Sequence, residues 1–164
     1  MLAKLLKLLH EIGAIGTLGT FASCIVLLAT APKAPAAYAA VFGGIAAITK
    51  WILVPSLAVV LISGLLAIAA NSAYKNAAWA WVKALLGLST FEGTLLAVDG
   101  NARRAAELSA LTAPGHGDTI ELAQVLHTEW GGLLVLMTLA LVNIVLAVWR
   151  PRLYRQKGAA ELTR

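Results

Sequence analysis

Residues 131–149 read GGLLVLMTLALVNIVLAVW, and this stretch contains no charged side chain. A helix of about 20 apolar residues crosses the roughly 30 Å hydrocarbon core of a bilayer. The stretch ends at Arg150-Pro151-Arg152, where basic residues and a proline are typical of the end of a span. It therefore predicts a transmembrane helix, and it decides the fold class.

Three earlier apolar runs have similar length, so we predict an all-α, four-helix transmembrane bundle that forms one domain over residues 1–164. A polar outer loop separates the third and fourth spans, and Ala102 to Leu111 within it predicts a short amphipathic helix. Asp118 is a candidate N-cap, with Glu121 three residues later. The expected segments are spans at about 8–31, 51–71, 77–98 and 129–149, the outer loop at 99–128 and a cytoplasmic tail at 150–164.

The composition agrees with a protein that lies in lipid. Hydrophobic residues make up 60% of the chain and charged residues 13%, with a mean hydropathy of +0.82. Soluble domains are about half apolar and about a quarter charged. These values exclude an ordinary soluble enzyme, and the single cysteine, Cys24, excludes a disulfide scaffold. We expect no nucleic-acid partner despite the net charge of +5, because the basic residues lie at the ends of apolar runs.

The distribution of basic residues predicts the orientation. Four spans put both termini on one side, which would hold Lys4, Lys7, Lys75, Lys83, Arg150, Arg152, Arg155, Lys157 and Arg164. The other side would hold Lys33, Lys50, Arg103 and Arg104. The positive-inside rule then predicts a multi-pass protein of the bacterial cytoplasmic (inner) membrane with both termini in the cytoplasm.

Two segments leave alternatives open. The first run could be a signal peptide, because Ala36-Ala37-Tyr38-Ala39 resembles a cleavage site, but its length and its His10 and Glu11 favour a retained span. Residues 36–50 either extend the second span beyond the bilayer or form a separate interfacial helix.

Ionisable residues within or beside the spans are functional candidates, because lipid offers no water to solvate them. For Lys50 and Lys83 we favour a side chain that reaches the interface. His10 shares a helical face with Thr17 and Cys24. It is either a packing histidine or a haem or metal ligand. Glu92 shares a helical face with Leu85 and Leu96. It is either a structural hydrogen-bond partner or a catalytic proton relay or metal ligand.

Near the outer end, His127 and Glu129 point in nearly opposite directions on one helix. His116, in a Pro-Gly-His-Gly-Asp turn, could fold over His127. With Glu129 or Glu92 these histidines would form a site suited to copper, zinc or iron. His10 and His127 are separated by roughly 30 Å. They would therefore serve two cofactor sites, or each would pair with its counterpart across a homodimer axis.

The segment Leu5-Leu6-Lys7-Leu8-Leu9-His10-Glu11-Ile12-Gly13-Ala14-Ile15 resembles the first span of a group of small four-span bacterial membrane proteins. Val54-Pro55-Ser56-Leu57 through Leu61-Ile62-Ser63-Gly64-Leu65-Leu66 is similar to their second span, and Trp149-Arg150-Pro151-Arg152 to their basic-Pro terminus. The group includes the copper-resistance D type, the haem-binding protoporphyrinogen oxidase J type and a related uncharacterised family. The resemblance covers about half the chain and implies haem ligation for His10 alone.

We therefore expect a b-type haem membrane protein for electron transfer or quinol-linked oxidation, with His10 and His127 as haem ligands. Glu92 would move the proton released by quinol, or ligate a second metal such as copper near the outer face. One alternative is a small proton- or ion-coupled transporter in which Glu92 and Lys50 line a wet path. Another is a non-catalytic assembly subunit that binds a partner helix through Gly13, Gly16 and Gly19.

Overall fold

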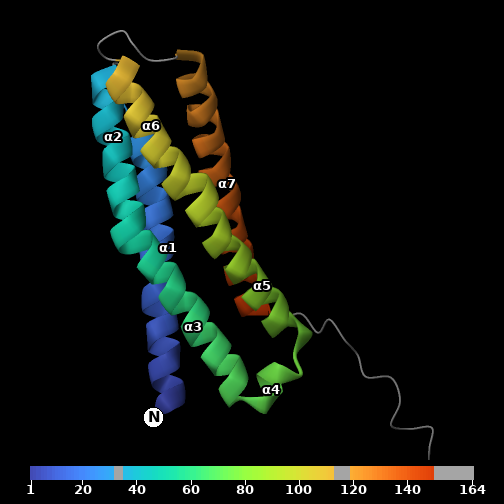
Figure 1. Cartoon of the computed structure of the whole chain (residues 1–164). Helices are drawn as coiled ribbons and strands as arrows, with labels where there is room; N and C mark the ends of the chain where they lie inside the picture. The colour runs from blue at the N-terminus through green and yellow to red at the C-terminus, as the bar shows by residue number, and fades with distance from the viewer. Residues whose placement is uncertain (32–34, 113–118, 150–164) are drawn as a thin grey trace, which may run out of the picture.

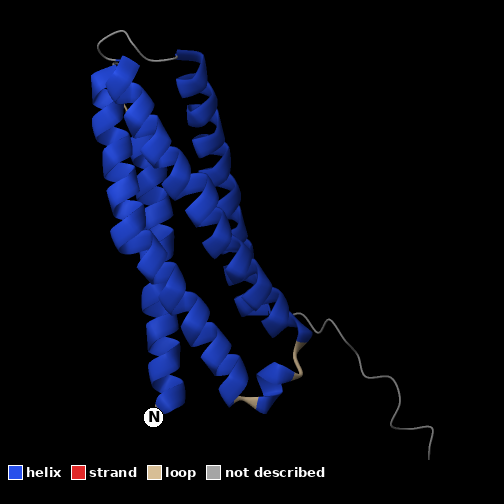
Figure 2. Cartoon of the chain, viewed as in Figure 1, coloured by secondary structure: helices blue, strands red, loops and turns tan. Residues whose placement is uncertain are grey.

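The fold is a bundle of long helices, as the sequence predicted (Figure 2). A computed structural model describes residues 1–31, 35–112 and 119–149, and these residues contain no strand. Within them, 4 helices are long and apolar enough to cross a membrane. The protein is therefore a multi-pass membrane protein. The four candidate spans are Leu2–Ala29, Ala37–Ala70, Ala78–Leu111 and Ile120–Trp149.

Helix α1 (Leu2–Ala29) packs closely against α3 (Val54–Ala70). A Cβ added at Gly13 would lie 2.8 Å from both the Ser56 carbonyl oxygen and Val60 Cγ2, and one at Gly16 would collide with the Ser56 side chain. A Cβ at Gly19 would meet nothing within 4 Å. Two of the three glycines thus let the backbones of α1 and α3 approach each other.

Residues 36–50 belong to a second long helix. It consists of α2 (Pro35–Ile48), the π-helical segment η1 (Thr49–Leu53) and α3, and the backbone is helical from one to the next. Its length is roughly 50 Å at about 1.5 Å per residue, which exceeds the roughly 30 Å hydrocarbon core. Residues 36–50 therefore extend the second span and do not form a separate helix.

The third long helix has the same construction. After the short helix α4 (Ser72–Lys75), it consists of α5 (Ala78–Gly93), the π-helical segment η2 (Thr94–Asp99) and α6 (Gly100–Thr112). The helix predicted for Ala102 to Leu111 is confirmed, but it continues the third span and is not a separate element of the loop. Helix α6 packs against α2 along the part of the bundle that extends past the π-helical segments.

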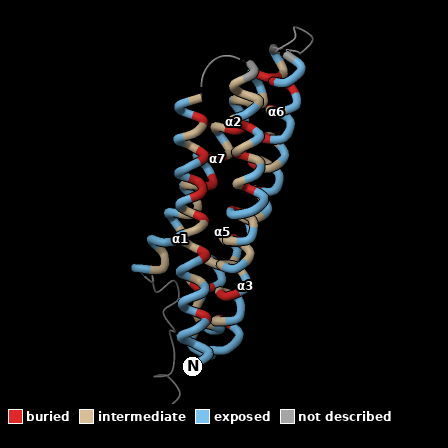
Figure 3. The backbone as a smooth tube through the Cα atoms, turned by 90° about the vertical axis from the view of Figure 1, so that its left-hand side faces the viewer, coloured by how far each residue is buried: buried red, intermediate tan, exposed pale blue. Residues whose placement is uncertain are grey.

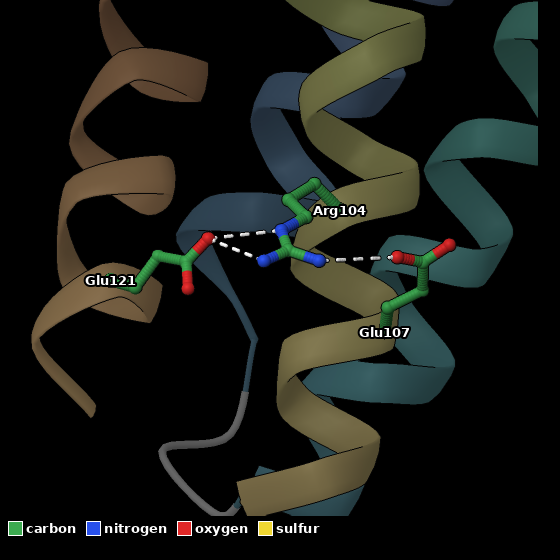
Figure 4. Close-up of polar contacts among 3 residues, drawn as sticks. All are labelled: Arg104, Glu107 and Glu121. Atoms are coloured by element: carbon green, nitrogen blue, oxygen red, sulfur yellow. Dashed lines mark hydrogen bonds and ion pairs between the residues drawn. The ribbon is translucent and has the colours of Figure 1, made fainter. Parts of the chain in front are cut away.

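Helix α7 (Thr119–Trp149) runs back toward the end of the bundle that holds Met1 and α4 (Figure 1). We call this the N-terminal end, and the opposite end, where α2 begins and α6 ends, the loop end. Asp118, the predicted N-cap, lies outside the described residues. Near the loop end, Arg104 on α6 donates two hydrogen bonds to Glu121 on α7, at 3.0 and 2.6 Å, and also pairs with Glu107 (Figure 4).

The buried residues form a continuous interior along the axis of the bundle (Figure 3). Its buried side chains come from α1, α2, α3, α6, α7 and both π-helical segments, and Phe91 of α5 packs against them. The fully buried apolar side chains are Phe21, Cys24, Phe42, Ile45, Leu53, Val98, Ala102, Ala105 and Leu133. The interior therefore continues from the membrane-spanning part into the extension formed with α2 and α6.

Candidate functional site

Glu129 is the one acidic side chain among the described residues that is fully buried, with an exposed fraction of 0%. It lies on α7, one residue before Trp130 and one turn before Leu133, which belongs to the apolar interior. Neither carboxylate oxygen has a hydrogen-bond partner among the described residues. Buried polar groups in proteins are almost always hydrogen-bonded, so this carboxylate requires a physical explanation.

The backbone near Glu129 is irregular in two neighbouring helices. Segments η1 and η2 contact each other, and η2 also contacts α7. One turn after Glu129, a Cβ added at Gly132 would lie 3.1 Å from Ala97 Cβ and 3.4 Å from the Ala97 carbonyl oxygen. This glycine allows α7 to approach η2 closely. π-helical turns within α-helices occur frequently at functional sites, and here η2 packs against the helix that carries the buried carboxylate while η1 contacts η2.

Two small polar side chains complete the site. The buried Cys24 thiol on α1 lies beside the Thr49 hydroxyl of η1 and close enough to Glu129 for an electrostatic interaction. Thr49 is itself 0% exposed, and its hydroxyl makes no hydrogen bond of good geometry with the described residues. We call Cys24, Thr49 and Glu129 the junction site, because they lie where the helices change from the membrane-spanning part to the extension.

The chemistry available to the junction site follows from its lack of donors. An ionised carboxylate in an apolar interior is very unfavourable unless a cation or several hydrogen bonds compensate its charge. The described residues provide neither a cation nor a hydrogen bond to Glu129. A proton on the carboxyl group, or a small cation bound beside it, would remove the unfavourable charge.

The outer metal site predicted from the sequence is not assembled within the described residues. His127 is exposed, whereas Glu129, two residues later on α7, is buried, as their opposite positions on one helix predicted. His116 lies outside the described residues. The described residues contain no group of three or more His, Cys, Asp and Glu side chains that could hold a metal ion.

His10 lies at the N-terminal end, between α1 and α3. Its Nδ1 atom is 3.0 Å from the Val60 carbonyl oxygen and 3.2 Å from Ser63 Oγ. A Cβ added at Gly64 would lie 3.5 Å from the imidazole ring. Because Ser63 Oγ donates to the Val59 carbonyl oxygen at 2.6 Å, the ring packs into a short polar contact between the two helices. His10 thus has the interhelical role expected of a packing histidine.

Glu92 and Lys50, which the transporter hypothesis placed along a wet path, are both exposed on the outside of the bundle. Glu92 shares its face with Leu85 and Leu96, as predicted, and these leucines are 63% and 78% exposed. Lys83 is half-buried and has an interaction partner within the described residues. The interior therefore contains Glu129 at the loop-end side, and neither Glu92 nor Lys50.

Sequence reasoning missed Thr49, Thr94 and Asn143. Both threonines are fully buried, and Thr94 Oγ1 donates to the Thr90 carbonyl oxygen at 2.8 Å. Asn143 Nδ2 donates to the Lys83 carbonyl oxygen at 3.2 Å, which links α7 to α5. An asparagine in the middle of the uncharged run at 131–149 was a visible signal. The threonines had none, because threonine is common in membrane helices.

Comparison of the chain with known protein families, curated proteins and solved structures finds no match.

Proposed function

We propose that this protein is a small proton-coupled transport protein in which Glu129 takes up and releases a proton inside the helix bundle. The single observation that supports the proposal is a fully buried carboxylate whose two oxygens have no hydrogen-bond partner among the described residues. Ionisable groups inside membrane bundles are rare, and those in pumps and transporters commonly form proton relays. Glu129 replaces Glu92 as the proton-handling residue, because Glu92 lies on the outer surface.

The neighbours of Glu129 support the same role. The hydroxyl of Thr49 and the thiol of Cys24 are small polar groups that can exchange hydrogen bonds with a carboxyl group as its protonation changes. The π-helical segments η1 and η2 interrupt the regular hydrogen-bond pattern of the two helices beside the site. Such segments are places where a helix can change its winding at low energetic cost.

The experiment is a proton-flux assay in liposomes that contain purified protein and a pH-sensitive dye. The variant Glu129→Gln keeps the shape of the side chain but cannot ionise, so we expect it to lose at least about 90% of the protein-dependent flux. Glu129→Asp keeps a carboxyl group and should retain measurable flux. Glu107→Gln on α6 is the matched control, because Glu107 is 66% exposed. Unchanged flux in Glu129→Gln would contradict the proposal.

A second function has an observation in its favour. We propose that His10 can serve as an axial ligand of a b-type haem in electron transfer, coupled to quinol oxidation. Its Nδ1 atom lies 3.0 Å from the Val60 carbonyl oxygen, which can only accept. The proton is therefore on Nδ1, and the lone pair of Nε2 is available to iron. Metal-bound histidines are typically oriented by such a contact.

An absorption spectrum tests the haem proposal. Protein expressed with ample haem should be red, with a Soret band that shifts on reduction with dithionite and disappears in His10→Ala. The variant His127→Ala shows whether the second predicted ligand takes part. Colourless protein without bound iron would contradict haem binding and leave the proton-coupled proposal unaffected.

We further infer that the protein lies in the bacterial cytoplasmic membrane with both termini in the cytoplasm. The support is the charge distribution, since nine of the 13 Lys and Arg residues belong to the side that holds the termini. Proteolysis or labelling of sealed membrane vesicles tests the orientation. Labelling of the termini from the periplasmic side would contradict it.

A further inference from the structure

An exposed carboxylate interrupts the apolar outer surface of α5. Glu92 is surrounded along the chain by leucines whose side chains are 41% to 78% exposed, namely Leu85, Leu88, Leu95 and Leu96. No ion pair or hydrogen bond joins Glu92 to another described residue. In a membrane-spanning helix, this face is the one that meets lipid. A glutamate there lacks both the water and the protein partner that such residues normally have.

A cation with the same exposure lies on the neighbouring helix. Lys50 belongs to η1 and is exposed, and its ammonium group lies 5.3 Å from the ring centre of Trp51, which is 73% exposed. No carboxylate pairs with Lys50 among the described residues. Among the described residues, the ammonium group therefore interacts with an indole ring of its own helix and with no carboxylate.

The two charges lie at similar levels along the bundle. Lys50 is part of η1, Glu92 comes two residues before η2, and η1 contacts η2. The helices also pack side by side on either side of these segments, α3 against α5 and α2 against α6. Two adjacent helices therefore carry, at one level of the bundle, an exposed anion and an exposed cation that have no ion-pair partner among the described residues.

Contact with lipid alone does not explain why Lys50 and Glu92 are both exposed on the bundle. A lysine can extend its long side chain toward the membrane surface, but a glutamate is too short to do the same from within an apolar face. Polar side chains that face lipid drive association of membrane helices, because another chain can supply the missing partner. The surface around Glu92 and Lys50 is thus suited to a partner that carries a cation and an anion in the reverse arrangement.

A second copy of this chain would supply a cation and an anion in the reverse arrangement. We propose that two copies associate through the α3–α5 face around a two-fold axis normal to the membrane, so that Lys50 of each copy pairs with Glu92 of the partner subunit. In a two-fold interface, contact of residue 50 with residue 92 implies the reciprocal contact. One chain that presents both charges is therefore complementary to itself. This inference is independent of the role proposed for Glu129.

Charge reversal tests the pairing, with association measured in liposomes by energy transfer between copies fused to donor and acceptor fluorescent proteins. Lys50→Glu alone would oppose two pairs of carboxylates, and Glu92→Lys alone would oppose two pairs of ammonium groups. Each variant should weaken self-association by about 10-fold or more. A mixture of the two variants makes both pairs complementary again, so the mixed dimer should associate as strongly as the unmodified protein.

The mixture also separates the possible explanations. If Lys50 and Glu92 of one chain pair with each other, the mixture fails to associate, whereas the double variant Lys50→Glu/Glu92→Lys is normal, and the proposal is overturned. If another membrane protein is the true partner, the unmodified chain shows no self-association, which also overturns it. Recovery in the mixture demonstrates that each variant is folded.

The matched control uses the ion pair of Lys7 and Glu11, whose side chains are 79% and 61% exposed on α1. Reversal of either charge, in Lys7→Glu or Glu11→Lys, should leave self-association unchanged. Equal weakening by these variants would mean that net charge, and not the α3–α5 face, controls association.

Discussion

Glu129 and Glu92 are glutamates in neighbouring helices of one membrane bundle, but their surroundings are opposite. Glu129 is fully buried on a helix that packs against the π-helical segment η2, whereas Glu92 lies on the outer surface among exposed leucines. In both places the carboxylate has no partner among the described residues. From this difference in surroundings we propose two roles for one residue type, proton exchange for the interior Glu129 and association for the outward-facing Glu92. The predictions below compare the interior with the outer surface, from the largest expected effect to the smallest.

The largest difference in stability between a buried and an exposed position should come from substitution of two glycines of α1. Gly13→Leu places a side chain against the Ser56 carbonyl oxygen and Val60, so we expect a loss of about 3 kcal/mol or more in stability. Gly19→Leu should have little effect, because a Cβ there meets nothing within 4 Å. Thermal unfolding in detergent, followed by circular dichroism, measures both. Equal destabilisation would show that α1 and α3 do not pack as described.

Replacement of each glutamate by leucine should separate the interior from the surface. Glu129→Leu removes a buried, unpartnered carboxyl group, so we expect a gain of about 1–3 kcal/mol in stability together with the loss of proton flux. Glu92→Leu should change the stability of one subunit by no more than about 0.5 kcal/mol, because the site is exposed. Chemical unfolding in mixed micelles gives both values. Destabilisation by Glu129→Leu would indicate a partner for this carboxyl group.

The smallest effect is expected for the ion pairs near the loop end. Arg104 is half-exposed, and so its contacts with Glu121 and Glu107 gain little from Coulomb attraction in water. Arg104→Ala should lower the melting temperature only slightly, and the difference should decrease further in high salt. Melting curves at low and high salt measure it. A large, salt-independent loss would show that α6 and α7 depend on this pair for their packing.

The sequence predicted the spans well because each is long, apolar and flanked by charges or prolines, as the uncharged run at 131–149 illustrates. Helical periodicity also predicted that His127 and Glu129 point apart, and that Glu92 shares a face with Leu85 and Leu96. It could not predict which face is buried. Apolar side chains lie all around α5, and the few polar ones, such as Lys83 and Glu92, do not mark a single face as the buried one.

The long helices were harder to predict than the spans. Residues 36–50 and 100–112 continue the spans through η1 and η2, and π-helical turns have no distinct residue signature. The junction site was missed because Cys24 comes close to Thr49 and to Glu129 only through the packing of separate helices. Cys24 was visible in the sequence only as a packing residue.

The most direct test of the account compares proton flux in liposomes that contain Glu129→Gln or Glu92→Gln. Both variants remove one carboxyl group and keep the shape of the side chain. Since Glu129 is the interior group, we predict that Glu129→Gln loses at least about 90% of the flux while Glu92→Gln retains it. Flux that persists in Glu129→Gln, or that is lost in Glu92→Gln alone, would contradict the account.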